Sequence, residues 1–111
     1  MRVLVPLRQG TSMAAYRVVQ ESLANAARHA PRSVVRLMVQ SVDDGLEVLV
    51  QNSIGEGAAA DGPAGHGLVG MRERVTAEGG RLEVGPLDDA TFRVRALMPV
   101  ATAQAVQAVQ A

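Results

Sequence analysis

Hydrophobic and polar residues follow two different periods along this chain. From residue 14 to residue 31 the apolar positions recur about every 3.6 residues, the spacing of a helix with one buried side. Thr11 or Ser12 is suited to cap the start of this helix, and Pro31 is suited to end it. We expect its core-facing stripe to contain Ala15, Val18, Val19, Ser22, Leu23, Ala26 and Ala30.

Two pairs of segments alternate with a period of two, which is typical of strands with one buried face. Residues 33–42 and 46–52 flank the turn sequence DDG, and residues 81–84 and 91–98 flank the turn sequence GPLDD. These pairs predict two antiparallel hairpins, in which one sheet face is dry and the other is wet. The short apolar run at 1–7 is suited to an edge strand.

A second helix is predicted at residues 68–78, with Gly79 and Gly80 as its C-cap. Before it, residues 53–67 have no periodicity, and a loop of this length is usually functional or disordered. The element order predicts an α+β fold, a two-layer sandwich with helices on one face of a mainly antiparallel mixed sheet. Residues 1–100 form one domain, and residues 101–111 form an Ala/Gln-rich tail that is helical or disordered.

Composition removes several classes of function. The formal net charge is zero and the 11 basic residues are scattered, so we expect no nucleic-acid partner. There is no cysteine, which excludes disulfide scaffolds, cysteine zinc sites and thiol nucleophiles. No apolar run is long enough to span a bilayer, so we expect a cytoplasmic domain without membrane contact.

The first helix carries three polar residues that project from neighbouring positions. Glu21, Asn25 and Arg28 follow one another at intervals of four and three residues, beside the apolar stripe. An amide oxygen suits Mg²⁺, a carboxylate orients water or a metal ligand, and a guanidinium pairs with phosphate. The spacing alone favours an ordinary solvated helix face over a site.

A second candidate is the glycine-rich sequence GHGLVGM at residues 65–71. Backbone N–H groups at a helix N-terminus bind phosphate, and glycine permits close approach. The segment follows a loop and not a strand, so it is no dinucleotide fingerprint, and the chain has no Walker loop. Of the two histidines, His29 is expected to pack at the helix end and His66 to lie on the loop, without forming a metal pair.

Together these stretches resemble a known family. Residues 16–30, YRVVQESLANAARHA, resemble the N box of the ATP-binding domain of bacterial sensor histidine kinases. Residues 65–86, GHGLVGMRERVTAEGGRLEVGP, resemble the glycine box of its nitrate-sensor-like and desaturase-sensor-like subgroup. The similarity covers residues 14–99. It implies the Bergerat ATPase fold, shared with gyrase, heat-shock chaperone and mismatch-repair ATPases, and the cofactors ATP and Mg²⁺.

The resemblance implies a role for each candidate residue. Asn25 matches the asparagine that coordinates Mg²⁺, and Glu21 matches the glutamate one turn before it. Arg28 and His29 match a basic pair near the phosphates, and residues 53–67 match the ATP lid. The glycine box that closes over the triphosphate is matched by Gly65, Gly67, Leu68 and Gly70.

The sequence departs from the family pattern after the first hairpin. Where the family usually has Asp-x-Gly-x-Gly, this chain reads VQNSIGEG, with Asn52 in the place of the aspartate and glycines at Gly55 and Gly57. The aspartate accepts a hydrogen bond from the adenine amino group. An asparagine carbonyl can accept the same bond, but the lost charge costs about 1 to 3 kcal/mol, which favours weak ATP binding.

The sequence contains no stretch like RELHD, the phosphoacceptor region that this family carries on a separate dimerisation domain. The resemblance therefore implies a catalytic domain alone, monomeric when isolated and inactive in autophosphorylation. Its expected partners are the histidine-bearing dimerisation domain, in a full-length kinase that is membrane-anchored or soluble, and a response regulator with a helix-turn-helix output domain. Two alternatives stay open, an anti-sigma-factor-like serine kinase and a non-catalytic docking module with a decayed nucleotide site.

Overall fold

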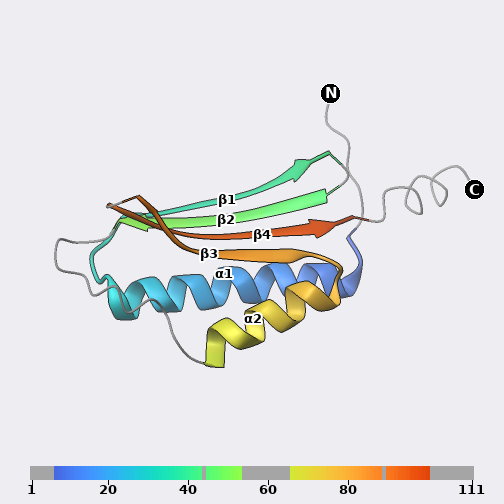
Figure 1. Ribbon diagram of the computed structural model, residues 1–111, viewed down its shortest axis with the longest axis horizontal. Helices are drawn as coiled ribbons and strands as arrows, with labels where there is room; N and C mark the ends of the chain where they lie inside the picture. Colours follow the sequence, from blue (N-terminus) through green and yellow to red (C-terminus); the bar gives the residue numbers. More distant parts are fainter. Residues whose placement is uncertain (1–6, 44, 54–65, 89, 101–111) are drawn as a thin grey trace, which may run out of the picture.

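The computed structural model describes residues 7–43, 45–53, 66–88 and 90–100. Helix α1 (Gln9–His29) is followed by strands β1 (Val35–Val42) and β2 (Gly45–Ser53), helix α2 (His66–Ala77), and strands β3 (Arg81–Asp88) and β4 (Thr91–Pro99). Both helices lie against the same face of one sheet (Figure 1). The expected two-layer α+β sandwich is therefore confirmed.

The four strands are ordered β1-β2-β4-β3. Among the described residues every strand pairing is antiparallel, so the parallel pair of a mixed sheet is not found there. Both predicted hairpins are present, and in the first one Val39 lies opposite Val48. The edge strand expected at 1–7 falls, apart from Leu7, outside the described residues, as do residues 54–65 of the predicted lid and the tail at 101–111.

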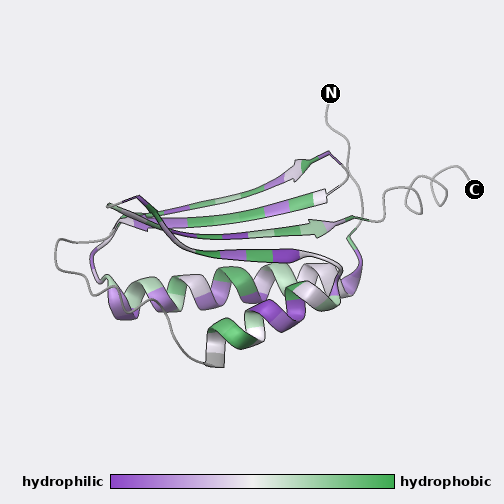
Figure 2. Cartoon of the chain, in the orientation of Figure 1, coloured by the Kyte–Doolittle hydropathy of each residue, from purple (hydrophilic) through white to green (hydrophobic). Residues whose placement is uncertain are grey.

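The core lies between the sheet and the two helices. Val18, Met71 and Val75 of the helices are at most 1% exposed, and they meet Val48 and Val50 of β2. Each such side chain contributes about 1.5 to 3 kcal/mol when it is fully buried. The strands alternate between hydrophobic and hydrophilic residues (Figure 2), so only one face of the sheet supplies this core.

The dry face does not extend over the edge strand β1. Leu37 and Val39 lie opposite Val50 and Val48, on the helix-facing side of the sheet, but they are 47% and 52% exposed. The reason is that α1 packs chiefly against β2 and β4, so it leaves this side of β1 uncovered by the described residues.

Two details predicted for α1 are wrong. The helix begins at Gln9, so Thr11 and Ser12 lie inside its first turn, and the N-cap residue Arg8 makes no side-chain cap hydrogen bond. Leu23, expected in the core, is 41% exposed and lies outside the core cluster.

The end of α2 forms the predicted glycine C-cap. The Gly79 N–H bonds to the Thr76 carbonyl and the Gly80 N–H to the Val75 carbonyl, which is the Schellman pattern, and Gly79 has a φ of 79°. The helix begins at His66, two residues before the predicted start, so His66 belongs to α2 and not to a loop. At Gly80 a Cβ atom would collide with the backbone carbonyl oxygen of Leu97.

Strand β3 is longer than predicted. It continues through Gly85 and Pro86 to Asp88, where a turn was expected. Proline is tolerated there because β3 is an edge strand, in which the missing N–H interrupts no ladder on its outer side. The pairing with β4 shifts register between Pro86 and Asp88.

The two helices exchange carboxylates at their N-terminal ends. The Glu78 carboxylate, just beyond α2, lies against Gly10 in the first turn of α1 and accepts a hydrogen bond of 3.3 Å from Thr11 Oγ1. In the other direction, the Glu21 carboxylate of α1 lies against Gly67 at the start of α2. Neither helix has an acidic residue in its own first turn. Each helix dipole is therefore complemented by a glutamate from the other helix.

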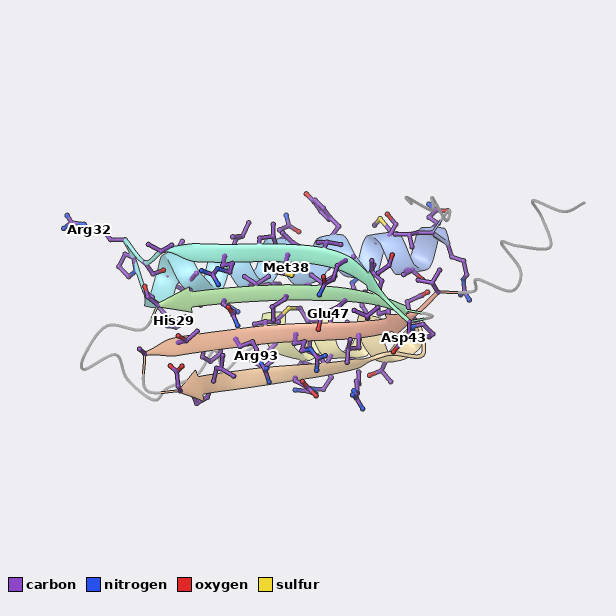
Figure 3. All side chains as sticks on the ribbon, turned by 90° about the horizontal axis from the view of Figure 1, so that it is seen from above. His29, Arg32, Met38, Asp43, Glu47 and Arg93 are labelled. Carbon is purple, nitrogen blue, oxygen red and sulfur yellow. The ribbon has the colours of Figure 1, made fainter. Side chains whose placement is uncertain are left out.

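The face of the sheet opposite the helices carries an ordered polar row (Figure 3). Glu47 is only 7% exposed, and its carboxylate accepts hydrogen bonds of 2.6 Å from Gln40 Nε2 and from Arg95 Nε. Arg95 also donates to Glu83 Oε1 at 3.2 Å. The hydrogen bonds from Gln40 and Arg95 lower the pKa of Glu47, while those to Glu47 and Glu83 raise the pKa of Arg95. This row links all four strands.

Replacing Glu47 with glutamine should destabilise the fold in a pH-dependent way. Because folding lowers the pKa of Glu47, its contribution is present above the ordinary value of 4.5 and is lost as pH falls through the lowered pKa. We expect Glu47→Gln to lower the free energy of unfolding at pH 7 by about 1 to 3 kcal/mol, and by much less at pH 3. Urea unfolding at both pH values measures this. Glu73→Gln, on an exposed position of α2, is the control, and an equal loss at both pH values would contradict the role of the charge.

Two glycines of the α2 region should respond to alanine in opposite directions. Gly80→Ala should lower the free energy of unfolding by about 1 to 3 kcal/mol, because the new Cβ meets backbone that cannot move aside. Gly70→Ala, inside α2 with open space around its Cα, should raise it by up to about 1 kcal/mol through helix propensity. Urea denaturation of both variants tests the pair, and a stable Gly80→Ala protein would refute the close contact.

Candidate functional site

The second half of α1 places the predicted polar residues at different depths. Asn25 is 9% exposed and faces the protein interior, whereas Glu21, one turn earlier, is half-buried. Arg28 and His29 in the last turn are both exposed, so His29 does not pack as expected. The three residues of the original trio are therefore not a uniformly solvated face. Their side chains range from buried (Asn25) through half-buried (Glu21) to exposed (Arg28).

The Asn25 side chain makes no hydrogen bond to any residue that the structure describes. Its oxygen, with the Glu21 carboxylate one turn away, is the type of ligand that Mg²⁺ prefers. The donor set therefore fits a magnesium ion.

The contact between Glu21 and Gly67 brings the two candidate motifs together. Gly67 is the second residue of α2, so the carboxylate lies at the positive end of that helix dipole. A Cβ atom at this position would occupy the space of the carboxylate, so any other residue here would require the Glu21 side chain to shift. The sequence could not show this proximity, because 46 residues separate the two positions.

Other residues of the glycine-rich motif are placed only in part. Leu68 is partly buried and packs against the core, so its side chain is structural. Gly70 has open space around its Cα, which means that no packing neighbour among the described residues requires a glycine there. The predicted residues Gly55, Gly57 and Gly65 lie outside the described residues.

Asn52 lies at the end of β2, on the face of the sheet that the helices cover. Its register partners are Val35 of β1 and Phe92 of β4. The Asn52 Nδ2 group donates a hydrogen bond of 3.1 Å to the Ser53 carbonyl, so Oδ1 is the end of the amide that can accept a bond from elsewhere. Figures 1 and 3 agree that β2 ends at the same end of the molecule as α1, where His29 is labelled.

Ser22 is a polar residue of this region that the sequence pattern assigned only to the core. It is buried as predicted, with an exposure of 3%, but its Oγ has no hydrogen-bond partner within residues 7–43, 45–53, 66–88 and 90–100. In the sequence, the only indication of a special role was a single hydroxyl within an apolar stripe. Only the structure shows that this hydroxyl is unpaired among the described residues.

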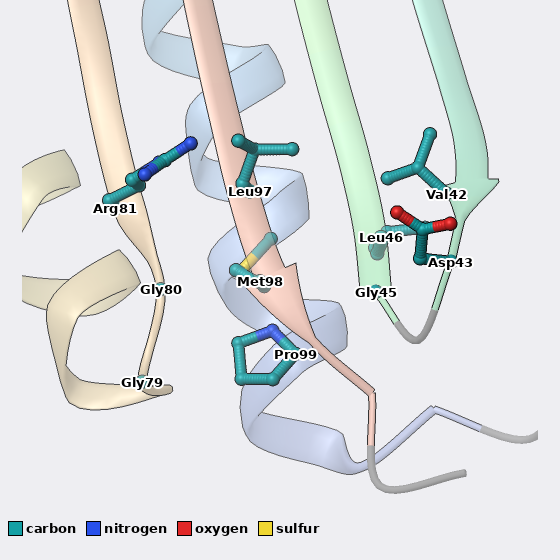
Figure 4. A pocket seen from close by; sticks show the side chains of 10 residues that line it. All are labelled: Val42, Asp43, Gly45, Leu46, Gly79, Gly80, Arg81, Leu97, Met98 and Pro99. Carbon is teal, nitrogen blue, oxygen red and sulfur yellow. The ribbon is translucent and has the colours of Figure 1, made fainter.

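The opposite end of the molecule has an open depression of about 420 Å³ (Figure 4). It lies between the β1–β2 turn, the α2–β3 junction and the end of β4, and its lining includes Asp43, Arg81, Leu97 and Met98. It contains none of the predicted site residues. Among the described residues there is no cluster of three or more His, Cys, Asp or Glu side chains that could hold a metal by themselves, and no helix long and apolar enough to cross a membrane.

Comparison with known proteins relates both sequence and fold to histidine kinases. No protein-family model matches the chain. Over 78 residues, the chain is 35% identical to the signal transduction histidine-protein kinase/phosphatase UhpB of Salmonella typhimurium. The match covers 70% of this chain but only 16% of that protein.

Solved structures give the same result. The histidine kinase domain from the Erythrobacter litoralis EL346 blue-light activated histidine kinase superposes with a TM-score of 0.66 and 26% identity, over 84% of this chain and 46% of that one. The histidine kinase domain of the E. coli osmosensor EnvZ gives a TM-score of 0.57 and 20% identity, over 79% of this chain and 65% of that one. The described chain therefore has the fold of a histidine kinase ATP-binding domain, and its sequence is similar to a segment of a histidine kinase.

Proposed function

We propose that this chain is the ATP-binding catalytic domain of a sensor histidine kinase of the nitrate-sensor-like and desaturase-sensor-like subgroup. In this proposal it binds Mg-ATP and donates the γ-phosphoryl group to a histidine on a separate dimerisation domain. A response regulator with a helix-turn-helix output would be the next acceptor. The similarity to a histidine-protein kinase/phosphatase and to histidine kinase domains supports this assignment.

The contact between Glu21 and Gly67 is the observation that carries the proposal. It joins the polar motif of α1 to the glycine-rich start of α2, two stretches that have no local reason to meet. Such an arrangement puts oxygen ligands for a cation beside backbone N–H groups that suit phosphate. A nucleotide triphosphate with Mg²⁺ is the ligand that uses both.

In the proposed complex each residue has a separate task. Asn25 Oδ1 would hold Mg²⁺, which supplies charge neutralisation for the phosphates, and Glu21 would orient a water molecule of its hydration shell. The exposed Arg28 and His29 would meet the outer phosphates, and the N-terminus of α2 would receive them. Phosphoryl transfer depends mostly on such positioning and charge stabilisation.

The base is assigned to the end of β2. With its Nδ2 group bonded to the Ser53 carbonyl, Asn52 offers Oδ1 to the adenine amino group. Phe92, its partner on β4, is partly buried and offers an apolar wall. The neutral amide makes this contact weaker than a carboxylate would.

Substitution of Asn25 should remove the Mg²⁺ dependence of nucleotide binding. We expect Asn25→Ala to weaken binding of a non-hydrolysable ATP analogue about 10- to 100-fold in the presence of Mg²⁺, with little effect in its absence. The fold should persist, because the side chain has no hydrogen-bond partner among the described residues to lose. Isothermal titration calorimetry with and without Mg²⁺ measures this. Gln20→Ala, on an exposed position of α1, is the control, and equal affinities for wild type and Asn25→Ala would contradict the role of Asn25.

Restoring a carboxylate at the base site should strengthen binding. We expect Asn52→Asp to raise affinity for adenine nucleotides about five- to 100-fold, because a charged acceptor bonds the amino group more strongly. Gln51→Glu is the matched control, since it adds the same charge to the adjacent position on the other face of the sheet. Parallel titrations of both variants separate a local bond from a general charge effect. A lower affinity of Asn52→Asp would show that the base lies elsewhere.

A further inference from the structure

The buried hydroxyl of Ser22 has no partner among the residues that the structure describes. Ser22 is 3% exposed, and its Oγ makes no hydrogen bond to them. A hydroxyl without a partner costs about 1 to 3 kcal/mol, and alanine or a larger apolar residue would fill the same stripe of α1 without that cost. A buried, unsatisfied group of this kind suggests a role that appears only when something else is bound.

The position of Ser22 relates it to the proposed base site. Ser22 lies one turn before Asn25 and Ala26, on the sheet-facing side of α1. It precedes the end of the helix by seven residues, or about 10 Å, which corresponds to roughly three residues of a strand. Because α1 and β2 end at the same end of the molecule (Figure 1), the last turns of α1 and the last residues of β2 lie toward that same end.

The chemistry of adenine requires what Ser22 can offer. The base has an amino group, which needs an acceptor, and ring nitrogens, which need a donor. Asn52 supplies the acceptor, and one of the two N–H donors of its amide is bonded to the Ser53 carbonyl. A serine hydroxyl is a donor that rotates to suit its partner. It therefore complements Asn52 on the same side of the sheet.

We propose that Ser22 is a second base-recognition residue, whose hydroxyl donates a hydrogen bond to a ring nitrogen of bound adenine, directly or through one water molecule. This inference rests on the proposed function. In this proposal Ser22 helps to recognise the adenine base, whereas Asn25 and the start of α2 bind the Mg²⁺ and the phosphates. It also explains why a polar group is kept in a stripe that otherwise packs apolar side chains.

The test compares wild type, Ser22→Ala and the control Ser12→Ala, which removes an exposed hydroxyl from the same helix. Calorimetric titration with Mg-ADP measures base and phosphate contacts together, and titration with magnesium tripolyphosphate measures phosphate contacts alone. Thermal unfolding without ligand measures the effect on the fold. We expect Ser22→Ala to bind Mg-ADP about 3- to 10-fold more weakly, to bind tripolyphosphate as wild type does, and to unfold at a higher temperature than wild type.

Each other outcome overturns a defined part of the proposal. If wild type binds Mg-ADP and Ser22→Ala binds it equally well, Ser22 does not read the base. Equal weakening for both ligands would point to a general distortion of the site, and a lower unfolding temperature would show that the hydroxyl has a partner in the free protein. Failure of wild type to bind either ligand would overturn the nucleotide site itself, and the role of Ser22 with it.

Discussion

The arrangement of this domain depends on two carboxylates that meet the N-terminal ends of the opposite helices. Glu78 lies at the start of α1 and Glu21 at the start of α2, and in both cases a glycine gives the carboxylate room. Each contact places a negative charge on the positive end of a helix dipole, a contribution of about 0.3 to 1 kcal/mol at a partly exposed site. The pair fixes the antiparallel alignment of the helices, and it thereby brings the polar end of α1 to the glycine-rich start of α2.

The remaining structure supports that alignment from the other side of the core. Apolar residues of α1 pack chiefly on β2 and β4, and those of α2 pack chiefly on β3. On the other face of the sheet, the row of Gln40, Glu47 and Arg95 connects β1, β2 and β4. Asn52, at the end of its strand, is positioned by the register with β1 and β4 and not by a loop. Residues at the ends of such rigid elements can hold a ligand with little reorganisation.

The sequence pattern predicted the helices and strands whose buried residues recur at regular intervals. It failed where the bounds of an element depend on a contact with residues far away in the sequence. Both hairpins and both helices were predictable because apolar residues recur with periods of 2 and 3.6. The start of α1 was not, because its complementing charge comes from Glu78, 67 residues away from Thr11. The length of β3 was misjudged because Pro86 is tolerated only in an edge strand, and edge position is a property of the assembled sheet. Among the site residues, Glu21 and Asn25 were identified from their spacing and resemblance, whereas the unpaired hydroxyl of Ser22 could be recognised only after folding.

The exchange of carboxylates also sets a limit on chain length. Gly10 and Glu21 are 11 residues apart, and so are Gly67 and Glu78. The glycine-to-glutamate interval is therefore the same in the two segments that contact each other. One inserted residue in either segment would turn the following side chains by about 100° and shift them by about 1.5 Å along the axis. One carboxylate would then miss its glycine while the other still met its own. A deletion or insertion in one of these segments would therefore cost one carboxylate contact, about 0.3 to 1 kcal/mol, and a matching change in the other segment would restore it.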